Sequence, residues 1–114
     1  MRIKDIIDLL EATHLTPELP DDNSFNYAFA SDLMSEVLTL ENNNILLITG
    51  LNNVQSLRTA YMADIHCIIL ARNKQASDEM LNLAKELQIH IIQSSYTMFR
   101  ISGILYSNNL KPVY

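Results

Sequence analysis

The chain has 114 residues, the usual size of one domain, and carries a formal net charge of −5 from thirteen acidic and eight basic side chains. Because 48% of the residues are hydrophobic and only two are glycine, we expect one packed core and exclude a disordered chain. The basic side chains are scattered, which argues against a nucleic-acid partner. No apolar run approaches the ~20 residues of a membrane helix, and the charged N-terminus does not resemble a signal peptide. We expect one cytoplasmic domain over residues 1–114, without a membrane partner.

The first thirty residues predict a helix, a loop and a strand. Isoleucine and leucine recur at helical spacing over residues 3–10, so a helix is expected that ends near Thr13. The prolines and acids that follow predict a loop, in which Asp21 and Asp22 are solvated. Phe25, Tyr27 and Phe29 then alternate with small or polar residues, which predicts a strand with one aromatic face.

A helix is expected directly after this strand. Ser31 can accept from the free N–H groups of a first helical turn, and Asp32 complements the positive end of the helix dipole. Leucine, methionine and valine within 33–38 form its apolar stripe. The next segment, 45–49, is continuously apolar, which is typical of a strand covered on both faces of a parallel sheet.

The rest of the chain repeats one unit of strand, polar turn and helix. The apolar strands open at Ile45, Cys67 and Ile89, each 22 residues after the one before. Helices are expected from Val54, from Ser77 and over the segment that contains Met98, and such helices supply the crossovers that parallel strands need. We therefore predict a three-layer α/β fold, with a mainly parallel sheet of four to five strands and helices on both faces.

A ligand site in such a fold lies beyond the carboxyl ends of the strands. That rule selects the polar residues that follow each predicted strand, which are Ser31, Asp32, Thr49, Gly50, Asn52, Asn53, Arg72, Asn73, Lys74, Ser94, Ser95 and Thr97. Free N–H groups of helix N-termini at this edge, joined by Arg72 or Lys74, could hold a phosphate or carboxylate. The alternative is that Ser31, Asn52 or Asn53, and Ser95 only cap their helices, which is the common role of Ser and Asn.

Gly50 and Arg58 need separate interpretation. Gly50 belongs to no glycine-rich phosphate loop, and we expect it to provide a turn that needs a positive φ angle. Arg58 falls outside the apolar stripe of its helix. It is either a surface charge near Asp64 or a contact to an anion or a second subunit.

No set of residues in the chain is typical of catalysis. His66 and His90 precede or open buried strands at the edge opposite the predicted ligand site, and His14 lies at the end of the first helix. Their spacing gives no sign of a metal site with Cys67, whose thiol is expected to be buried and inert. Ser31 and Asp32 have no histidine at their edge, so no hydrolase triad is supported. We expect no metal, no cofactor and no enzymatic activity.

Several stretches together resemble the DRTGG domain family, in the order and at the approximate spacing of its small stand-alone members. They are Ala28-Phe29-Ala30-Ser31-Asp32-Leu33-Met34-Ser35, Leu47-Ile48-Thr49-Gly50-Leu51, Arg58-Thr59-Ala60 and Tyr96-Thr97-Met98-Phe99. The Asp-Arg-Thr-Gly-Gly string that names the family is absent, because the turn after residues 45–49 is Gly50-Leu51-Asn52-Asn53. Functions tied to that string are therefore not implied for this chain.

The resemblance implies a fold similar to the N-terminal domain of HPr kinase. It also implies a regulatory or dimer-forming part, since such domains accompany CBS domains in regulated pyrophosphatases and precede phosphotransacetylase domains. The expected function is a non-catalytic regulatory domain, a homodimer that senses a small anionic ligand such as a nucleotide. The alternative is an interaction module without a small ligand, which pairs with itself or with an enzyme subunit. Tyr61, Tyr96, Phe99 and Tyr106 favour it, because aromatic residues are enriched at interfaces.

Overall fold

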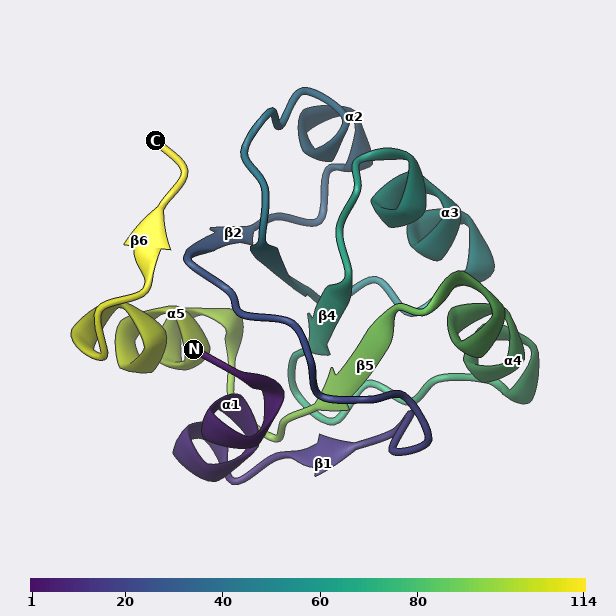
Figure 1. The fold of residues 1–114 in the computed structure, drawn as a ribbon, viewed down its shortest axis with the longest axis horizontal. Coiled ribbons are helices and arrows are strands. Elements are labelled where there is room, and N and C mark those ends of the chain that lie inside the picture. Colours follow the sequence, from purple (N-terminus) through teal and green to yellow (C-terminus); the bar gives the residue numbers. More distant parts are fainter.

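Helices and strands alternate along the whole chain in the computed structural model, which describes residues 1–114 (Figure 1). The helices are α1 (Ile3–Leu10), α2 (Met34–Val37), α3 (Val54–Met62), α4 (Asp78–Leu87) and α5 (Met98–Ser107). The strands are β1 (Thr13–His14), β2 (Tyr27–Ala30), β3 (Ile45–Thr49), β4 (Cys67–Leu70), β5 (His90–Gln93) and β6 (Lys111–Pro112). None of the helices combines the length and the apolar character needed to cross a bilayer.

All six strands belong to one sheet, in the order β1-β5-β4-β3-β2-β6. Every neighbouring pair is parallel except β1 and β5, so the predicted α/β fold with a mainly parallel sheet is confirmed. The sheet has six strands where four to five were predicted. The additional strands are the two-residue edge strands β1 and β6, which are too short to produce a periodic pattern in the sequence.

The central strands are buried on both faces, which explains their continuous apolar runs. Along β3, Leu46 and Ile48 belong to one core cluster, and Ile45 and Leu47 belong to the other. Helices α1 and α5 contribute to the first cluster, while α2, α3 and α4 contribute to the second (Figure 1). The alternation of strand side chains therefore divides the core into two parts, each covered by its own helices.

Three helices begin at capping side chains. Asn53, Ser77 and Thr97 each accept a hydrogen bond from the backbone N–H three residues further on, at 2.8, 3.1 and 3.2 Å. The predicted capping role of Asn53 is therefore confirmed. Ser95 was expected to cap the last helix, but that helix begins later, because Thr97 supplies the cap. Ser95 is exposed and makes no hydrogen bond through its side chain.

The region around β2 differs from the prediction in two ways. The helix expected from Ser31 is the four-residue α2, and the Ser31 Oγ accepts instead from the Leu33 N–H at 2.9 Å in the preceding turn. The predicted single aromatic face is also wrong. Phe25 lies before β2 and packs in the cluster of α1 and α5, whereas Tyr27 and Phe29 pack against the other cluster.

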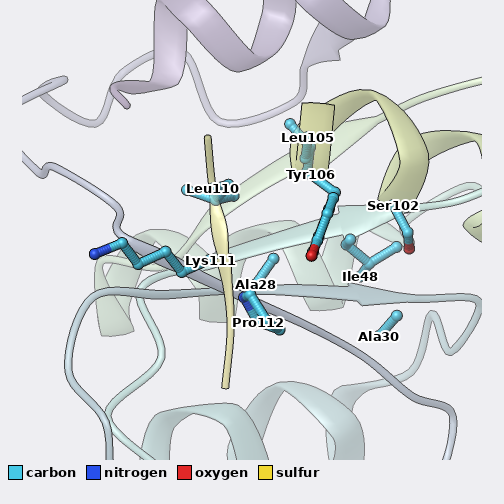
Figure 2. A pocket seen from close by; sticks show the side chains of 9 residues that line it. All are labelled: Ala28, Ala30, Ile48, Ser102, Leu105, Tyr106, Leu110, Lys111 and Pro112. Atoms are coloured by element: carbon cyan, nitrogen blue, oxygen red, sulfur yellow. The ribbon is translucent and has the colours of Figure 1, made fainter. Parts of the chain in front are cut away.

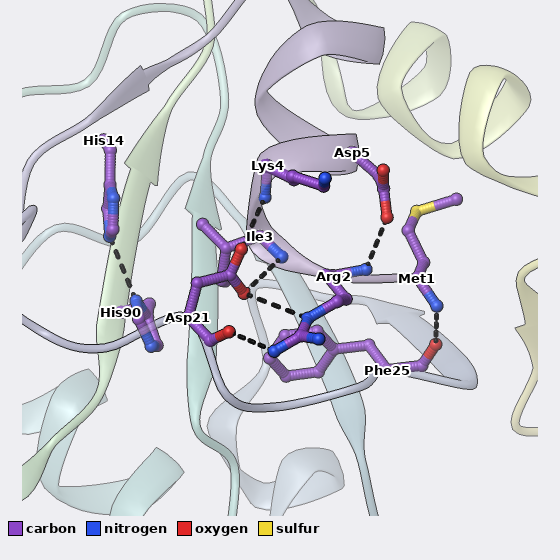
Figure 3. A network of polar contacts seen from close by, with 9 residues as sticks. All are labelled: Met1, Arg2, Ile3, Lys4, Asp5, His14, Asp21, Phe25 and His90. Atoms are coloured by element: carbon purple, nitrogen blue, oxygen red, sulfur yellow. Dashed lines mark hydrogen bonds and ion pairs between the residues drawn. The ribbon is translucent and has the colours of Figure 1, made fainter.

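The loop before β2 holds the start of α1. The Asp21 carboxylate accepts from the N–H groups of Ile3 at 3.0 Å and Lys4 at 3.2 Å, and it lies 4.0 Å from the Arg2 Nε (Figure 3). It thus satisfies two of the free donors of the first turn. The expectation of a solvated Asp21 is wrong, because this contact joins residues that lie far apart in the sequence.

Candidate functional site

A surface pocket of about 360 Å³ opens where β2, β3 and β4 end, beside the start of α5. We call it the strand-end pocket. The predicted site residues that line it are Asp32, Gly50, Arg72, Lys74 and Thr97. Three further residues complete the lining, namely Ala71, Met98 and Phe99. The parallel strands thus bring together residues from four separate turns.

Asp32 joins the ends of β2 and β3. Its Oδ1 accepts from the Thr49 Oγ1 at 2.8 Å and from the Gly50 N–H at 2.7 Å, and Thr49 in turn accepts from the Leu51 N–H at 3.1 Å. Thr49 is therefore buried structure beneath the pocket and not a part of its lining. The carboxylate makes no contact as a helix cap, and its Oδ2 has no hydrogen-bond partner.

Gly50 does not have the positive φ angle that was predicted. Its N–H donates a hydrogen bond to the Asp32 Oδ1 at 2.7 Å. A Cβ at this position would lie 3.6 Å from the Asp32 Oδ2, which is an ordinary contact distance. The structure therefore gives no steric reason for glycine here.

The left-handed backbone lies instead in the turn after β4. Arg72 and Asn73 both have a φ of 55°, and their N–H groups donate to the carbonyls of Tyr96 at 2.9 Å and Ser94 at 2.7 Å. These donors are consequently not available to a ligand. The side chains of Arg72 and Lys74 are exposed and form no ion pair, so any contribution of this turn to anion binding comes from its two cations.

The start of α5 supplies free backbone donors to the same pocket. Thr97 accepts from the Arg100 N–H through its side chain and from the Ile101 N–H through its carbonyl. The N–H groups of Met98 and Phe99 have no partner, and both residues line the pocket. Unpaired N–H groups in the first turn of a helix favour anionic groups.

The pocket therefore combines charges of both signs. Arg72, Lys74 and the α5 N–H groups attract an anion, while the free Oδ2 of Asp32 accepts a hydrogen bond. An anion that also carries hydroxyl or amino donors satisfies both sets of groups.

The remaining predicted residues lie outside this pocket. Asn52 donates from its Nδ2 to the Gln75 carbonyl at 2.7 Å, Asn53 caps α3, and the Asn73 carbonyl accepts from the Gln93 side chain. Ser31 and Ser95 are not among the residues that line the pocket. Whether a side chain reaches the pocket depends on its direction after the turn, which the sequence does not specify.

Arg58 forms no ion pair, with Asp64 or with any other carboxylate. It lines a separate depression between α3 and α4, where Glu79 and Glu86 are the nearby charged residues. Asp64 was expected beside it, but the Asp64 Oδ1 lies 3.0 Å from the His66 Nε2. The acidic surroundings of Arg58 make this depression a poor site for an anion.

Two of the histidines converge, contrary to the expectation from their spacing. The His14 Nε2 lies 3.0 Å from the His90 Nδ1, and the two rings stack with their centroids 5.1 Å apart (Figure 3). Burial lowers the pKa of both imidazoles, against the opposing charge of Asp21. The contact depends on the antiparallel pairing of β1 with β5, which spacing along the chain cannot reveal.

The remaining candidate metal ligands and the cysteine thiol do not form a site. No three His, Cys, Asp or Glu side chains are arranged to hold a metal ion. Cys67 is fully buried, and burial raises the pKa of its thiol far above the ordinary value.

These features define a small α/β domain with a polar pocket at the ends of parallel strands. The model of the DRTGG domain family matches residues 5–107, and the chain belongs to this family. The resemblance seen in the sequence is thereby confirmed.

The chain is similar in sequence to one group of known proteins and similar in fold to one solved structure. It is 31% identical over 87 residues to HPr kinase/phosphorylases of Streptococcus agalactiae serotypes Ia, III and V, covering 76% of this chain and 28% of theirs. The chain thus spans little more than a quarter of those proteins. Its fold is similar to the CBS and DRTGG domains of the regulatory region of a Clostridium perfringens pyrophosphatase, crystallised with the activator diadenosine tetraphosphate. That match has a TM-score of 0.70 at 16% identity and covers 90% of this chain and 45% of the other.

Proposed function

We propose that this domain is a non-catalytic regulatory module that binds a small anionic ligand, such as a nucleotide, in the strand-end pocket and acts as a homodimer. The observation that carries the proposal is the convergence of Arg72, Lys74 and the free N–H groups of Met98 and Phe99 on one pocket. Neither cation has a carboxylate partner within the chain, so both are available to a ligand. The nucleotide activator bound to the regulatory region of the C. perfringens protein supports this class of ligand.

The chemistry of the pocket favours a phosphorylated molecule with hydroxyl groups over a simple inorganic anion. A guanidinium, an ammonium and backbone N–H groups are typical partners of phosphate oxygens. The free Oδ2 of Asp32 repels a bare anion and accepts a hydrogen bond from a hydroxyl, such as that of a ribose. A nucleotide carries both groups in one molecule.

The same residues support a binding role over a catalytic one. The lining contains no histidine and no cysteine, and its one carboxylate, Asp32, is fixed by Thr49 and Gly50. A group that transfers protons during a reaction needs access to the reacting atom and a pKa suited to the transfer. The Asp32 Oδ1 is instead engaged in holding two strand ends together.

The proposal is tested by thermal unfolding with adenine nucleotides, diadenosine polyphosphates, acyl phosphates and inorganic phosphate, each at about 1 mM. A ligand whose dissociation constant is 100-fold lower adds ~2.7 kcal/mol to the free energy of unfolding. For a chain of this length that raises the midpoint by about 10 °C. We expect such a shift with one nucleotide class, and we expect Arg72→Ala and Lys74→Ala to reduce it.

Arg58→Ala is the matched control, because it removes one positive charge at a separate depression. It should leave the ligand-induced shift unchanged. An absence of any shift, or a shift that persists in the Arg72→Ala, Lys74→Ala double variant, would contradict binding in this pocket. Isothermal titration calorimetry on the same variants then gives the affinity directly.

An interaction module without a small ligand is the second candidate, and one observation favours it. Phe99 and Tyr106 are 90% and 69% exposed on α5, an unusual position for large aromatic side chains. A protein that binds no compound of the panel, yet associates with itself or with an enzyme subunit through α5, would support this candidate.

A further inference from the structure

One exposed face of α5 has no charged residue. We call it the α5 face, and its residues are Phe99, Ser102, Gly103, Tyr106 and Ser107, which also line a shallow depression on the helix surface. Their spacing places them on one side of the helix. The side chain of Phe99 is 90% exposed and that of Tyr106 is 69% exposed, so both ends of the face carry an aromatic ring in contact with water.

Gly103 lies between these two rings, in the interior of the helix. Glycine is a poor helix former, and a Cβ at this position would meet no atom within 4 Å. Packing within the chain therefore does not require glycine here. A second backbone that approaches α5 closely from outside would require it.

An apolar pocket adjoins the α5 face at the Tyr106 end. It has a volume of about 160 Å³ between α5, β2 and β6 (Figure 2). The small side chains of Ala28 and Ala30 leave the space, and Ser102 and Tyr106 belong both to this pocket and to the α5 face. Protein cavities of about 150 Å³ with apolar walls hold a benzene molecule. The pocket therefore has room for one phenyl ring.

We propose that the α5 face is the interface of a homodimer, in which two α5 helices pack antiparallel about a twofold axis between Ser102 and Gly103, and Phe99 of each copy enters the apolar pocket of the other. This proposal deepens the homodimer part of the proposed function and does not depend on a ligand.

The positions of the Phe99 and Tyr106 rings favour a second copy of this chain as the partner. Phe99 lies 3.5 residues before the midpoint between Ser102 and Gly103, and Tyr106 lies 3.5 residues after it. Each is thus about 5 Å along the helix from that midpoint. A twofold axis there places the Phe99 of a second copy beside Tyr106 and the apolar pocket, twice per dimer. Such self-complementarity is what an isologous interface requires.

Charge favours the same arrangement. Each copy carries a formal net charge of −5, so two copies repel each other on average. Helix α5 has no acidic residue, and its one charged side chain, Arg100, packs over the Tyr96 ring at 3.7 Å. Pairing through α5 therefore brings no carboxylates of this helix together.

The interface would couple dimerisation to the ligand site. Phe99 lines the strand-end pocket as well as the α5 face. A ligand that contacts the start of α5 therefore acts on a residue that the dimer also uses, which gives the coupling of two binding events a physical basis.

Sedimentation equilibrium of the full chain without any ligand, from about 1 to 100 μM, tests the interface. We expect a wild-type dimer and, for Phe99→Ala, a dissociation constant raised at least ~100-fold, because each dimer loses two buried rings. Met62→Ala is the matched control, since Met62 is 75% exposed on α3 and should leave the dissociation constant unchanged. A wild-type monomer at 100 μM, or a dimer that Phe99→Ala leaves intact, overturns the proposal.

Disulfide trapping tests the antiparallel register independently. Cys67 is buried and stays unreactive, so Ser102→Cys and Ser107→Cys each introduce one thiol on the α5 face, and neither removes Gly103. In the proposed dimer the two copies of position 102 face each other near the axis and cross-link on oxidation. The two copies of position 107 are offset by about 13 Å along the helices and do not. Equal cross-linking of both variants overturns the antiparallel arrangement. Because no ligand is present, either failure leaves the anion-binding proposal standing.

Discussion

Replacing Asp32 by alanine removes the acceptor that holds the end of β2 to the end of β3. In the wild-type chain the Asp32 Oδ1 accepts from the Thr49 hydroxyl at 2.8 Å and from the Gly50 N–H at 2.7 Å. Gly50 lines the strand-end pocket, and Thr49 is fully buried beneath it. The variant leaves these donors without their partner and makes the turn after β3 less constrained.

The expected loss follows from the number and the kind of bonds. A hydrogen bond to a charged group contributes about 1.5–3 kcal/mol when it is shielded from water. Asp32 is exposed, so water competes for its carboxylate oxygens, and the two bonds together contribute about 2 kcal/mol. With an unfolding entropy of about 2.1 cal/mol/K per residue, this lowers the midpoint of a chain of this length by roughly 8 °C. Asp32→Asn keeps a neutral acceptor and should lose about half as much.

Thermal and urea-induced unfolding, followed by circular dichroism, measure these differences. Glu41→Ala is the control for the charge change, because Glu41 is exposed and forms neither a hydrogen bond nor an ion pair through its side chain. It should stay within about 0.5 kcal/mol of the wild type. If Asp32→Ala does the same, Asp32 does not join the strand ends, and our account of the floor of the pocket is refuted.

Three further predictions concern single groups. Burial lowers the pKa of His14 and His90 in the folded state. The unfolded chain therefore takes up protons first as the pH falls below about 6.5, and the free energy of unfolding should decrease there while staying flat above it. His14→Gln should weaken this slope in urea titrations between pH 5.5 and 7.5, and an unchanged slope would refute the assignment. Asn53→Ala should cost about 1 kcal/mol in unfolding experiments, since Asn53 caps α3, and should leave ligand-induced shifts intact. Cys67, fully buried with a raised pKa, should react with a thiol reagent only after denaturant is added, and reaction in the native state would contradict its burial.

The parts of the fold that the sequence predicts are those with a local pattern. The apolar runs of β3, β4 and β5 predict buried strands because both of their faces are covered. Asn53 marks the start of a helix because a cap acts within three residues. The edge strands β1 and β6, the contact of Asp21 with the start of α1 and the pair of His14 with His90 have no such pattern. They depend on segments that meet only after the chain has folded.

The sequence predicts the edge of the sheet at which the candidate site lies, but not which side chains line it. The rule that parallel strands end at one edge of the sheet selects Asp32, Gly50, Arg72, Lys74 and Thr97, and these five residues line one pocket. That they bind a ligand stays a prediction. The rule does not specify the direction of each side chain after its turn, so it also selected residues that cap helices or bind neighbouring backbone. The free N–H groups of α5 were missed as specific donors. Their availability depends on where the helix begins, which Thr97 determines.

Solution NMR is the most direct test of the central claim, that the strand-end pocket binds a small anionic ligand. Backbone amide resonances of the ¹⁵N-labelled chain would be followed during titration with ADP, and with inorganic phosphate for comparison. We predict that the largest shifts occur at Asp32, Gly50, Arg72, Met98 and Phe99, which line that pocket. Phosphate alone should bind more weakly than ADP. Shifts concentrated elsewhere, such as at the apolar pocket between α5, β2 and β6, or no shifts with either compound, would contradict the account.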